Sequence, residues 1–266
     1  MSNPTLDVQV AAAKAYEALF VPALFGQWAP RVVDAANLAV GESVLDVACG
    51  TGVLAREAHR RTGLKGYVAG LDPSVGMLAV ATEFTPAVDW QQGTAEAMPF
   101  SDATFDVVVS QFGLMFMDHD RAIHEMLRVL KPKGRLVVAV WDAVQNNPAY
   151  AAEIALLERL AGTQAADALR APFVLGNREL LAKVFHDADA GAATISTSKG
   201  VARFPNIRVM VEADLRGWLP VMGVNLTEAE IGRVLNEAED VLDSYVTDDG
   251  RVTFDVRAHL VTAKKP

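Results

Sequence analysis

Two acidic residues and a glycine-rich turn have a spacing that could bind a ligand carrying a ribose. Asp46 lies four positions before Gly50 in the turn Gly50-Thr51-Gly52, and Asp72 lies twenty positions after Gly52. Glycines permit a tight turn and a close approach of the backbone to a ligand. The first N–H groups of a following helix point at whatever lies there. An acidic residue at position 72 can accept hydrogen bonds from two ribose hydroxyls.

Asp46 distinguishes between two classes of nucleotide-like ligand. The stretch Gly50-Thr51-Gly52-Val53-Leu54-Ala55 also matches a dinucleotide-binding fingerprint that ends in alanine. A carboxylate close to that turn would repel a pyrophosphate, but it would attract an ammonium or sulfonium group. S-adenosylmethionine carries both cations, a ribose and an adenine, and no phosphate. A carboxylate inside a buried strand is costly unless it is paired, so we interpret Asp46 as a ligand-binding residue.

The elements that must position these residues alternate between strands and helices. Compact apolar runs are found at residues 43–48, 67–71, 87–91, 105–110 and 135–141. Such runs are typical of strands buried on both faces of a parallel sheet. Between the last two runs, a helical apolar stripe consists of Ile123, Met126, Leu127 and Leu130, and Lys131-Pro132-Lys133-Gly134 predicts its end. This alternation predicts a doubly wound sheet, in which ligands bind beyond the carboxyl ends of the strands.

The flanking segments predict further elements around this core. Residues 6–20 are expected to form a helix, after which Pro22, Gly26 and Pro30 break the chain. After Trp141, helices are expected from residue 147 and over 179–186, 207–218 and 227–242, with strands over 192–204 and 251–263. We expect a single domain over 1–266. Its parts are an N-terminal helical cap (1–40), a cofactor-binding core (41–141), a helical lid (142–190 and 205–246) and closing strands (192–204 and 251–263).

Composition excludes several other classes of protein. The 266 residues are 51% hydrophobic and 21% charged, with a net charge of -9 and one cysteine, Cys49. This is ordinary globular composition, and an acidic surface disfavours a nucleic-acid partner. A lone cysteine excludes a disulfide within the chain, and the scattered histidines predict no metal site. Residues 1–4 do not resemble a signal peptide, and no uninterrupted apolar run reaches the ~18 residues of a membrane span. A cytoplasmic location is the expectation.

Five sequence motifs resemble those of a known family when they are taken in order. Residues 44–52 (Val-Leu-Asp-Val-Ala-Cys-Gly-Thr-Gly) resemble the first motif of class I S-adenosylmethionine-dependent methyltransferases, and residues 70–78 resemble the second. Residues 93–100, 105–110 and 128–136 are similar to the later motifs. The resemblance is to the UbiE-like branch and covers about residues 40–141. It implies a Rossmann-like sheet of seven strands, mostly parallel, with the last strand antiparallel.

The resemblance also implies roles for individual residues around S-adenosylmethionine. The methionine moiety would be bordered by Asp46, Ala48, Gly50, Thr51 and Gly52. Asp72 would hold the ribose hydroxyls. The adenine would lie near Pro73, Met77, Thr94 and Ala95, and many relatives have Asp or Asn where this chain has Thr94.

The transferred methyl group has its own set of candidate neighbours. Gln111 and Phe112, just past the fourth predicted strand, would lie beside the sulfonium and beneath the methyl group. Tyr16 and Trp28 could close over the cofactor, where an aromatic face suits a sulfonium. The alternative for both is packing in the core. His119 is a weak candidate for a general base, and its alternative is a loop histidine beside a helix cap.

The expected reaction is in-line methyl transfer to a small apolar or aromatic acceptor, with S-adenosylhomocysteine as the product. Methyl transfer needs an aligned acceptor and little side-chain chemistry. Candidate acceptor-binding residues in the helical lid are Phe173, Trp218 and Met222, with Val174, Leu175 and Leu219 beside them. These residues could instead form the core of the lid or a homodimer contact. An NAD-dependent oxidoreductase, a non-catalytic S-adenosylmethionine-binding protein and a nucleic-acid methyltransferase stay open as alternatives.

Overall fold

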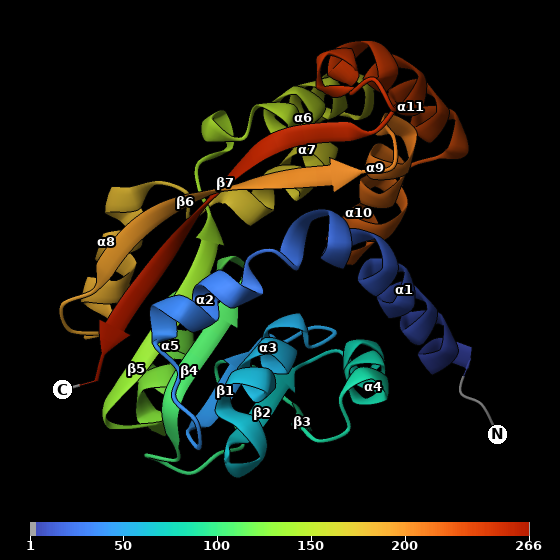
Figure 1. Cartoon of the computed structure of the whole chain (residues 1–266). Coiled ribbons are helices and arrows are strands. Elements are labelled where there is room, and N and C mark those ends of the chain that lie inside the picture. The colour runs from blue at the N-terminus through green and yellow to red at the C-terminus, as the bar shows by residue number, and fades with distance from the viewer. Residues whose placement is uncertain (1–3, 266) are drawn as a thin grey trace.

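A single seven-stranded sheet forms the centre of the molecule. The computed structural model describes residues 4–265, and the strand order is β3-β2-β1-β4-β5-β7-β6 (Figure 1). The strands are β1 (Ser43–Val47), β2 (Tyr67–Asp72), β3 (Asp89–Gln92), β4 (Phe105–Gln111), β5 (Leu130–Trp141), β6 (Thr194–Phe204) and β7 (Val252–Lys264). The first five run parallel, and β7 is antiparallel to both β5 and β6. The predicted fold class is confirmed. Residues 1–3, part of the stretch in which no signal peptide was seen, lie outside the described residues.

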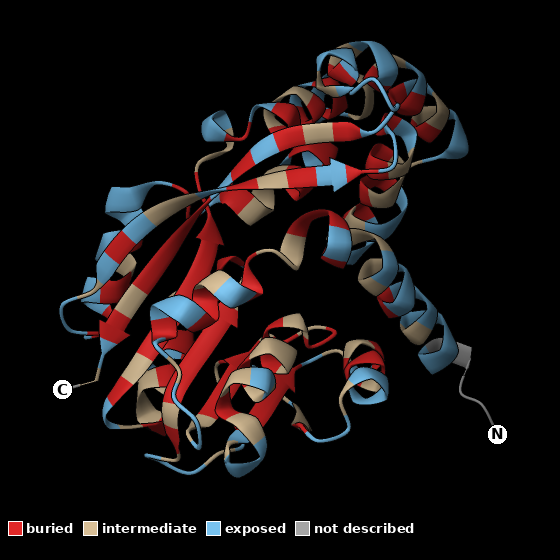
Figure 2. Cartoon of the chain, viewed as in Figure 1, coloured by how far each residue is buried: buried red, intermediate tan, exposed pale blue. Residues whose placement is uncertain are grey.

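The central strands are buried on both faces, as their apolar runs predict (Figure 2). Val44 and Leu45 in β1 and Val107 and Val108 in β4 have no exposed surface. Parallel strands covered by helices on both sides are apolar without alternation. The register pairs Asp46 of β1 with a β2 residue two positions before Asp72, so both carboxylates lie toward the carboxyl ends of their strands.

Helices cover the sheet and extend past one end of it. The helices beside the first five strands are α1 (Pro4–Phe20), α2 (Ala29–Ala36), α3 (Val53–Thr62), α4 (Val75–Phe84) and α5 (His119–Val129). The later helices are α6 (Pro148–Ala161), α7 (Thr163–Arg170), α8 (Arg178–Asp187), α9 (Ile207–Ala213), α10 (Leu219–Val221) and α11 (Glu228–Leu242). All of these except α8 pack together as one group in the upper part of Figure 1.

Three boundaries differ from the sequence-based expectation. Leu130 does not end a helix but begins β5, which pairs with β4 at Leu130 and again from Arg135 onward, across an irregularity. Pro22 does not break the chain, because it lies in the first turn of a π-helical turn, η1 (Val21–Phe25), where a missing N–H costs little. The helix expected over 207–218 is α9 followed by a second π-helical turn, η6 (Asp214–Trp218), which leads into α10.

The segment between η1 and α2 is fastened to the edge strand β6. The side-chain amide of Gln27 donates to the carbonyl of Val201 at 2.9 Å and accepts from its N–H at 2.8 Å. Arg31 donates to the carbonyl of Lys199 at 2.7 Å. These bonds satisfy backbone groups that an edge strand otherwise leaves open, so the N-terminal segment is held across the sheet.

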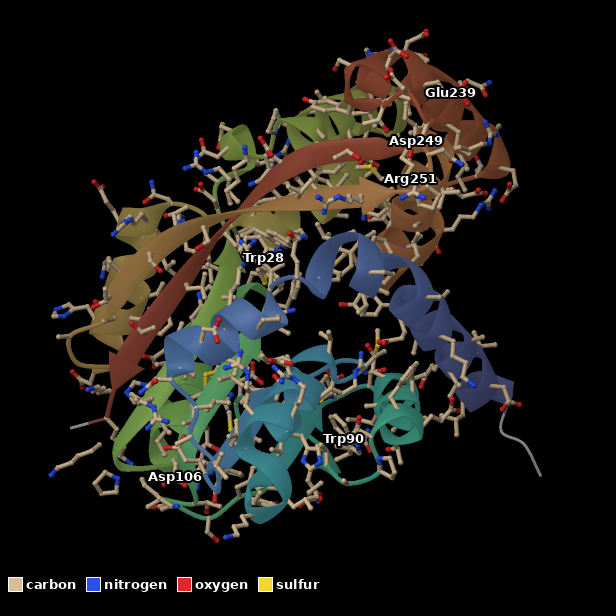
Figure 3. All side chains as sticks on the ribbon, viewed as in Figure 1. Trp28, Trp90, Asp106, Glu239, Asp249 and Arg251 are labelled. Atoms are coloured by element: carbon tan, nitrogen blue, oxygen red, sulfur yellow. The ribbon has the colours of Figure 1, made fainter. Side chains whose placement is uncertain are left out.

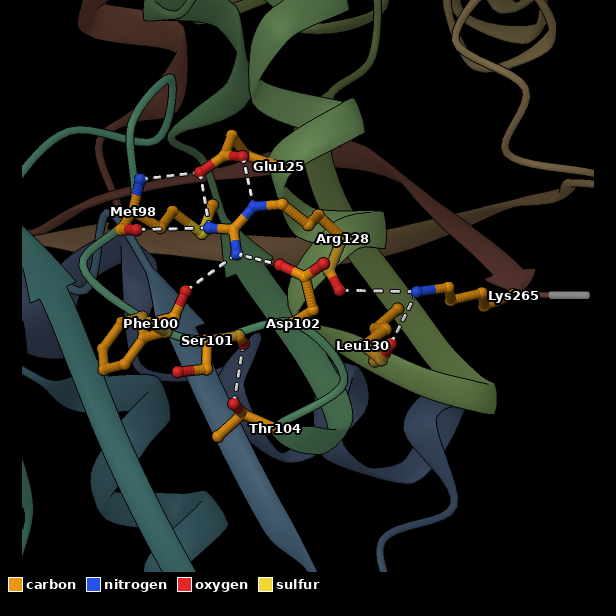
Figure 4. Close-up of polar contacts among 9 residues, drawn as sticks. All are labelled: Met98, Phe100, Ser101, Asp102, Thr104, Glu125, Arg128, Leu130 and Lys265. Carbon is orange, nitrogen blue, oxygen red and sulfur yellow. Dashed lines mark hydrogen bonds and ion pairs between the residues drawn. The ribbon is translucent and has the colours of Figure 1, made fainter.

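Arg128, in the last of the resembling motifs, organises the loop that follows β3. Its guanidinium donates to the carbonyls of Met98 and Phe100 and to the carboxylates of Asp102 and Glu125 (Figure 4). Glu125 also accepts from the N–H of Met98 at 2.8 Å. Hydrogen bonds from Glu125 and Asp102 hold the pKa of Arg128 above its ordinary value. The loop is therefore tied to α5 at several points.

Within the described part of the chain, one segment is long and apolar enough overall to cross a membrane. It is Leu6–Phe25, with a mean hydropathy of 1.3. Lys14 and Glu17 interrupt its apolar run. Glu17 pairs with Arg56 of α3 at 2.6 Å, and α1 packs on α4. In this structure 22% of its apolar window is buried, and the segment contacts α3 and α4.

Candidate functional site

The glycine turn after β1 and the end of β2 meet at one point. The N–H of Gly50 donates to Asp72 Oδ2 at 2.9 Å, and the N–H of Ser74 donates to Asp72 Oδ1 at 2.9 Å. Ala48, Gly50 and Gly52 all have positive φ angles, of 56°, 55° and 86°. Each carboxylate oxygen has two lone pairs, so Asp72 keeps acceptor capacity for a ligand. Asp72 thus fixes the turn and can still bind hydroxyl groups.

Asp46 is buried without a compensating partner. The residue is 1% exposed, and neither carboxylate oxygen makes a hydrogen bond of normal geometry with another described residue. Burial raises the pKa of Asp46 well above its ordinary value, and the nearby Asp72 raises it further, against opposing effects of the Ala55 backbone and Arg56. A carboxylate in this setting gains most from a cationic ligand.

Other buried polar atoms lie at the same end of β1 and β4. Thr51 Oγ1, Ser110 Oγ and Gln111 Oε1 are buried, and none hydrogen-bonds to a partner within residues 4–265. The amide nitrogen of Gln111 donates to the carbonyl of Phe25 at 3.2 Å, which leaves its oxygen free to accept. Buried polar groups are normally satisfied, so this set fits a ligand with several hydrogen-bonding groups. Sequence reasoning had named Thr51 and Gln111 but not Ser110.

Trp90 of β3, which is labelled in Figure 3, packs against Gly52 and Gly70, and sequence reasoning missed it. A Cβ added to Gly52 would lie within 3.2 Å of Trp90 Cζ2 and Cζ3, and one added to Gly70 would collide with the same ring. The indole nitrogen donates to the carbonyl of Thr85 at 3.0 Å, which fixes the ring plane. The ring can lie there only because both neighbours lack side chains. Trp90 is therefore a support for the glycine turn.

Helix α1 reaches the turn through a second pair that sequence reasoning missed. Arg56 Nη1 donates to the carbonyl of Thr51 at 2.6 Å, and Arg56 Nη2 pairs with Glu17 at 2.6 Å. Tyr16, the neighbour of Glu17, stacks on Phe25 with ring centroids 5.4 Å apart. Burial raises the pKa of Tyr16 well above its ordinary value, and the charges of Glu17 and Asp72 raise it further.

Phe112 and Trp141 form an aromatic stack at the ends of β4 and β5. Their ring centroids are 3.8 Å apart, with 9° between the planes. Phe112 has a positive φ of 57°, which turns the chain where the candidate methyl site lies. Trp28 is fully buried and meets both rings edge-on at 5.8 Å, and the Arg31 guanidinium carbon lies 4.7 Å from the centroid of the Trp28 ring. Trp28 therefore packs against this stack.

The adenine candidates lie on two segments after β2 and β3. Pro73 precedes α4, where the Ser74 hydroxyl caps the helix by accepting from the N–H of Met77 at 3.3 Å. In the loop after β3, Thr94 is exposed and Ala95 is buried.

His119 and Cys49 lie in surroundings that are ordinary for structural residues. Asp118 is the N-cap of α5 and accepts from the N–H of Arg121 at 3.3 Å, so His119 is the first helical residue and not the cap. Cys49 is buried, and burial together with Asp46 and Asp72 raises the pKa of its thiol well above the ordinary value. A thiol in this environment stays protonated and is a poor nucleophile.

The three acceptor candidates lie on separate parts of the later helices. Phe173 is buried, with its ring 6.5 Å from Trp141. The Trp218 ring lies 5.2 Å from Phe116, and its indole nitrogen donates to the carbonyl of Ala168 at 2.8 Å. Met222, in the turn after α10, is partly buried. Phe173 and Trp218 therefore approach the sheet at the ends of β5 and β4. Across the described ranges, no three His, Cys, Asp or Glu side chains are arranged to hold a metal ion.

Comparisons with known proteins match the core of the chain. Residues 45–138 match the family model described as a methyltransferase domain. The chain is 46% identical over 114 residues to a demethylmenaquinone methyltransferase of Renibacterium salmoninarum, which covers 42% of this chain and 47% of that protein. It is 36% identical over 146 residues to the ubiquinone/menaquinone biosynthesis C-methyltransferase UbiE of Idiomarina loihiensis, covering 51% of this chain and 58% of that protein.

A solved structure extends the likeness in fold beyond that core. Phosphoethanolamine N-methyltransferase 2 of Haemonchus contortus, in complex with S-adenosyl-L-methionine, superposes with a TM-score of 0.58 at 18% identity, over 97% of this chain and 57% of that chain. This likeness concerns the fold alone. The sequence alignments span about half the length of the curated relatives. The sequence likeness to methyltransferases is therefore found over residues 45–138, which match a methyltransferase domain.

Proposed function

We propose that this protein is an S-adenosylmethionine-dependent methyltransferase that acts on a small apolar or aromatic molecule. The observation that carries the proposal is Asp46, a buried carboxylate without a partner of its own among the described residues, beside the glycine turn. A cationic ligand compensates such a group and a pyrophosphate does not. The alternative of an NAD-dependent oxidoreductase shares the glycine turn but gives Asp46 no role.

The residues of the site fit S-adenosylmethionine group by group. Asp46 would hold the ammonium of the methionine moiety, with the backbone of the turn beside it. Asp72 would accept from the ribose hydroxyls, and Met77 and Ala95 would flank the adenine. The Tyr16 ring and the Gln111 carbonyl oxygen would face the sulfonium. When bound, S-adenosylmethionine supplies a methyl group on a sulfonium that is already a good leaving group.

The protein's own task is then to align the acceptor and exclude water. The stacked rings of Phe112 and Trp141 would form an apolar floor for the acceptor, and the Glu17–Arg56 pair would hold α1 beside the turn. Holding two reactants in line removes much of the entropic barrier to their reaction. A general base is needed only if the acceptor must lose a proton. His119 stays a weak candidate for that role, with its Nε2 buried and unpartnered by any residue that the structure describes.

The acceptor is proposed to be a small molecule bound between the core and the helices over 142–190 and 205–246, which would act as a lid. The quinone-related names of the relatives suit an apolar aromatic acceptor. Phe173, Trp218 and Met222 are the proposed contacts. The cytoplasmic location, the absence of a nucleic-acid partner and a homodimer remain predictions of the same proposal.

Thermal shifts test the proposal directly. S-adenosylmethionine and S-adenosylhomocysteine should raise the Tm of the protein, because a ligand that binds only the native state stabilises it, and NAD should not. Asp72→Ala should reduce the shift strongly. Asp255→Ala is the matched control, because Asp255 is an exposed partner of Lys199 on β7. A shift with NAD but not with S-adenosylmethionine would overturn the proposal. Binding without methyl transfer to any of a panel of naphthols and quinols would favour a non-catalytic binding protein.

A further inference from the structure

A second pair of buried acidic residues lies far from Asp46 in the sequence, among the later helices. Glu153 of α6 is fully buried, and neither of its carboxylate oxygens has a hydrogen-bond partner among residues 4–265. Asp214, the first residue of the π-helical turn η6, is 4% exposed, and its Oδ2 is likewise unpartnered there. Burial raises the pKa of Glu153 and the charge of Asp214 raises it further, so the two carboxyl groups lie near each other. π-helical turns inside helices are frequent at functional sites.

Among the described residues no Lys or Arg side chain is buried, so no buried cation of that kind neutralises this pair. Helices α7, α9 and α11 pack around α6 and η6. Their buried residues in the described structure are all apolar: Ala165, Ala166, Ala168 and Leu169 of α7, Ile207, Met210 and Val211 of α9, and Ile231, Val234, Leu235, Ala238 and Leu242 of α11. One titratable neighbour is Tyr150 of α6, whose pKa is raised by burial and by the charges of Asp214 and Glu153. Unpaired carboxyl groups in such a setting are costly to the fold.

A row of aromatic rings connects this pair to the candidate methyl site. It runs from Phe112 to Trp141, whose ring centroids are 3.8 Å apart, then to Phe173 at 6.5 Å and to Tyr150 at 5.6 Å. All four side chains are buried. One end of the row lies at the glycine turn of the sheet, and the other lies beside the acidic pair. The four rings therefore form an apolar row, and the two carboxyl groups make its Tyr150 end polar.

We infer that Glu153 and Asp214 form the polar end of the acceptor pocket and bind a hydroxyl group of an aromatic acceptor whose ring lies along the row from Phe112 to Tyr150. This deepens the proposed function and rests on it for the position of the methyl group. A carboxyl group and a hydroxyl group can each donate and accept, so a hydroxyl can satisfy the free oxygens of the pair. Glu153 and Asp214 would then determine which acceptors are selected.

The state of the pair favours a neutral hydroxyl over a cationic amine as the bound group. Burial raises the pKa of both Asp214 and Glu153, and the charge of Asp214 raises that of Glu153 further. Carboxyl groups that hold their protons near neutral pH attract cations weakly, but they are good hydrogen-bond donors to a neutral oxygen. Both oxygens of Glu153 lack a hydrogen-bond partner among the described residues, so Glu153 is free to bond to such a hydroxyl.

Paired probes with and without the hydroxyl test the inference. The Kd values of 1-naphthol and naphthalene are measured on the full chain, both with saturating S-adenosylhomocysteine and without it. The wild type should bind 1-naphthol at least about tenfold more tightly, because a hydrogen bond to a charged or strongly polar group corresponds to about that ratio. Glu153→Leu should remove the preference and leave naphthalene binding unchanged. Glu153→Gln should retain part of it, since the amide donates and accepts.

A matched control and a stability measurement separate this role from a purely structural one. Glu158→Gln changes an exposed acid on the same helix and should bind both probes as the wild type does. Glu153→Leu should also raise the Tm, because it removes a desolvated carboxyl group. If Glu153→Leu does not fold, Asp214→Asn gives the same comparison, and it should lower the preference as well.

Specific results would overturn the inference. These are an equal affinity of the wild type for both probes, a preference unchanged in Glu153→Leu or Asp214→Asn, or tighter binding of 1-naphthylmethylamine than of 1-naphthol. The proposed function would fail in a different way, through the absence of any Tm shift with S-adenosylmethionine or S-adenosylhomocysteine. If the proposed function fails, the ratio of the Kd values of 1-naphthol and naphthalene without S-adenosylhomocysteine still tests the acidic pair.

Discussion

The indole ring of Trp90 lies in the space that a β-carbon on Gly52 would require. Three ring carbons lie in or inside van der Waals contact with that position, and Gly52 has a φ of +86°. The turn after β1 and strand β3, which β2 separates in the sheet, therefore pack together because Gly52 has no side chain. This contact sets the distance between the glycine turn and the sheet.

Gly52→Ala should lower stability and weaken S-adenosylhomocysteine binding, because the methyl group strains the backbone and displaces the indole ring. Overpacking and a left-handed backbone together suggest a loss of about 2–4 kcal/mol. The double variant Gly52→Ala with Trp90→Leu should recover part of that loss, which urea unfolding would measure. Gly232→Ala, on open helix surface with no neighbouring atom within 4 Å, is the control and should not destabilise the protein. Equal losses in the single and double variants would contradict the proposed fit.

Asp46 should make the stability of the free protein depend on pH. Its folded pKa is raised above the ordinary value of 3.8 by burial first and by Asp72 second. From about pH 4 upward to the folded pKa, the unfolded chain has released a proton that the folded chain still holds, so stability falls as pH rises. Asp46→Asn should remove this part of the fall and raise the Tm at pH 7. A Tm–pH curve with the same slope in both proteins would argue against it.

The same carboxyl group should couple ligand binding to proton release. A cationic ligand favours the ionised form, so the affinity for S-adenosylmethionine should rise with pH and protons should leave on binding. Calorimetry in phosphate and in Tris, which differ in ionisation enthalpy, measures that release. Binding heats that do not depend on the buffer would show that Asp46 does not ionise on binding.

Arg56→Met should weaken S-adenosylhomocysteine binding by about tenfold, which corresponds to the loss of about one charged hydrogen bond. Arg56 joins the carbonyl of Thr51 to Glu17 of α1, and both side chains of this ion pair are largely buried. Lys14→Met breaks an exposed pair between α1 and α4 and is the control, because exposed pairs contribute little. Calorimetric titration of both variants gives the comparison. Similar losses in the two would show that α1 acts through its general docking and not through Arg56.

Thr227→Ala should lower the free energy of unfolding by about 1 kcal/mol and leave cofactor affinity unchanged. Thr227 and Glu230 form a capping box at the start of α11, with bonds of 2.8 Å and 3.3 Å to each other's backbone amides. Loss of such a cap has a typical cost of this size. Urea unfolding and a thermal shift with S-adenosylhomocysteine measure the two quantities. A weakened thermal shift would link α11 to the cofactor site.

The core of the fold could be predicted because short continuous stretches of the sequence determine its strands and helix caps. β1, β2 and β4 begin where their apolar runs begin, and the capping box at Thr227 falls on a four-residue pattern. The π-helical turns at Val21–Phe25 and Asp214–Trp218 could not be predicted, since their neighbours in three dimensions decide them. Pro22 was expected to break the chain, yet it occupies a position where a helix tolerates proline.

The candidate site could be predicted from the sequence only in part, because some of its residues come together only in the folded chain. Asp46, Asp72 and the glycine turn lie within thirty residues, and their spacing carries meaning. Trp90 and Arg56 act across the chain, so no short pattern reveals them. Glu153 did leave a signal: it occupies the apolar stripe that Tyr150, Ile154 and Leu157 share at helical spacing, and an acid on that stripe could have been noticed.

The side-chain amide of Gln27 has a consequence for assembly. The Gln27 amide hydrogen-bonds to both backbone groups of Val201, and Arg31 donates to the carbonyl of Lys199. These side chains therefore occupy backbone groups of the edge strand β6 that an added strand would use. A strand of a second molecule would find these backbone groups of β6 already hydrogen-bonded. Two copies of this chain cannot therefore join into one continuous sheet through the middle of β6 without first displacing the stretch between η1 and α2.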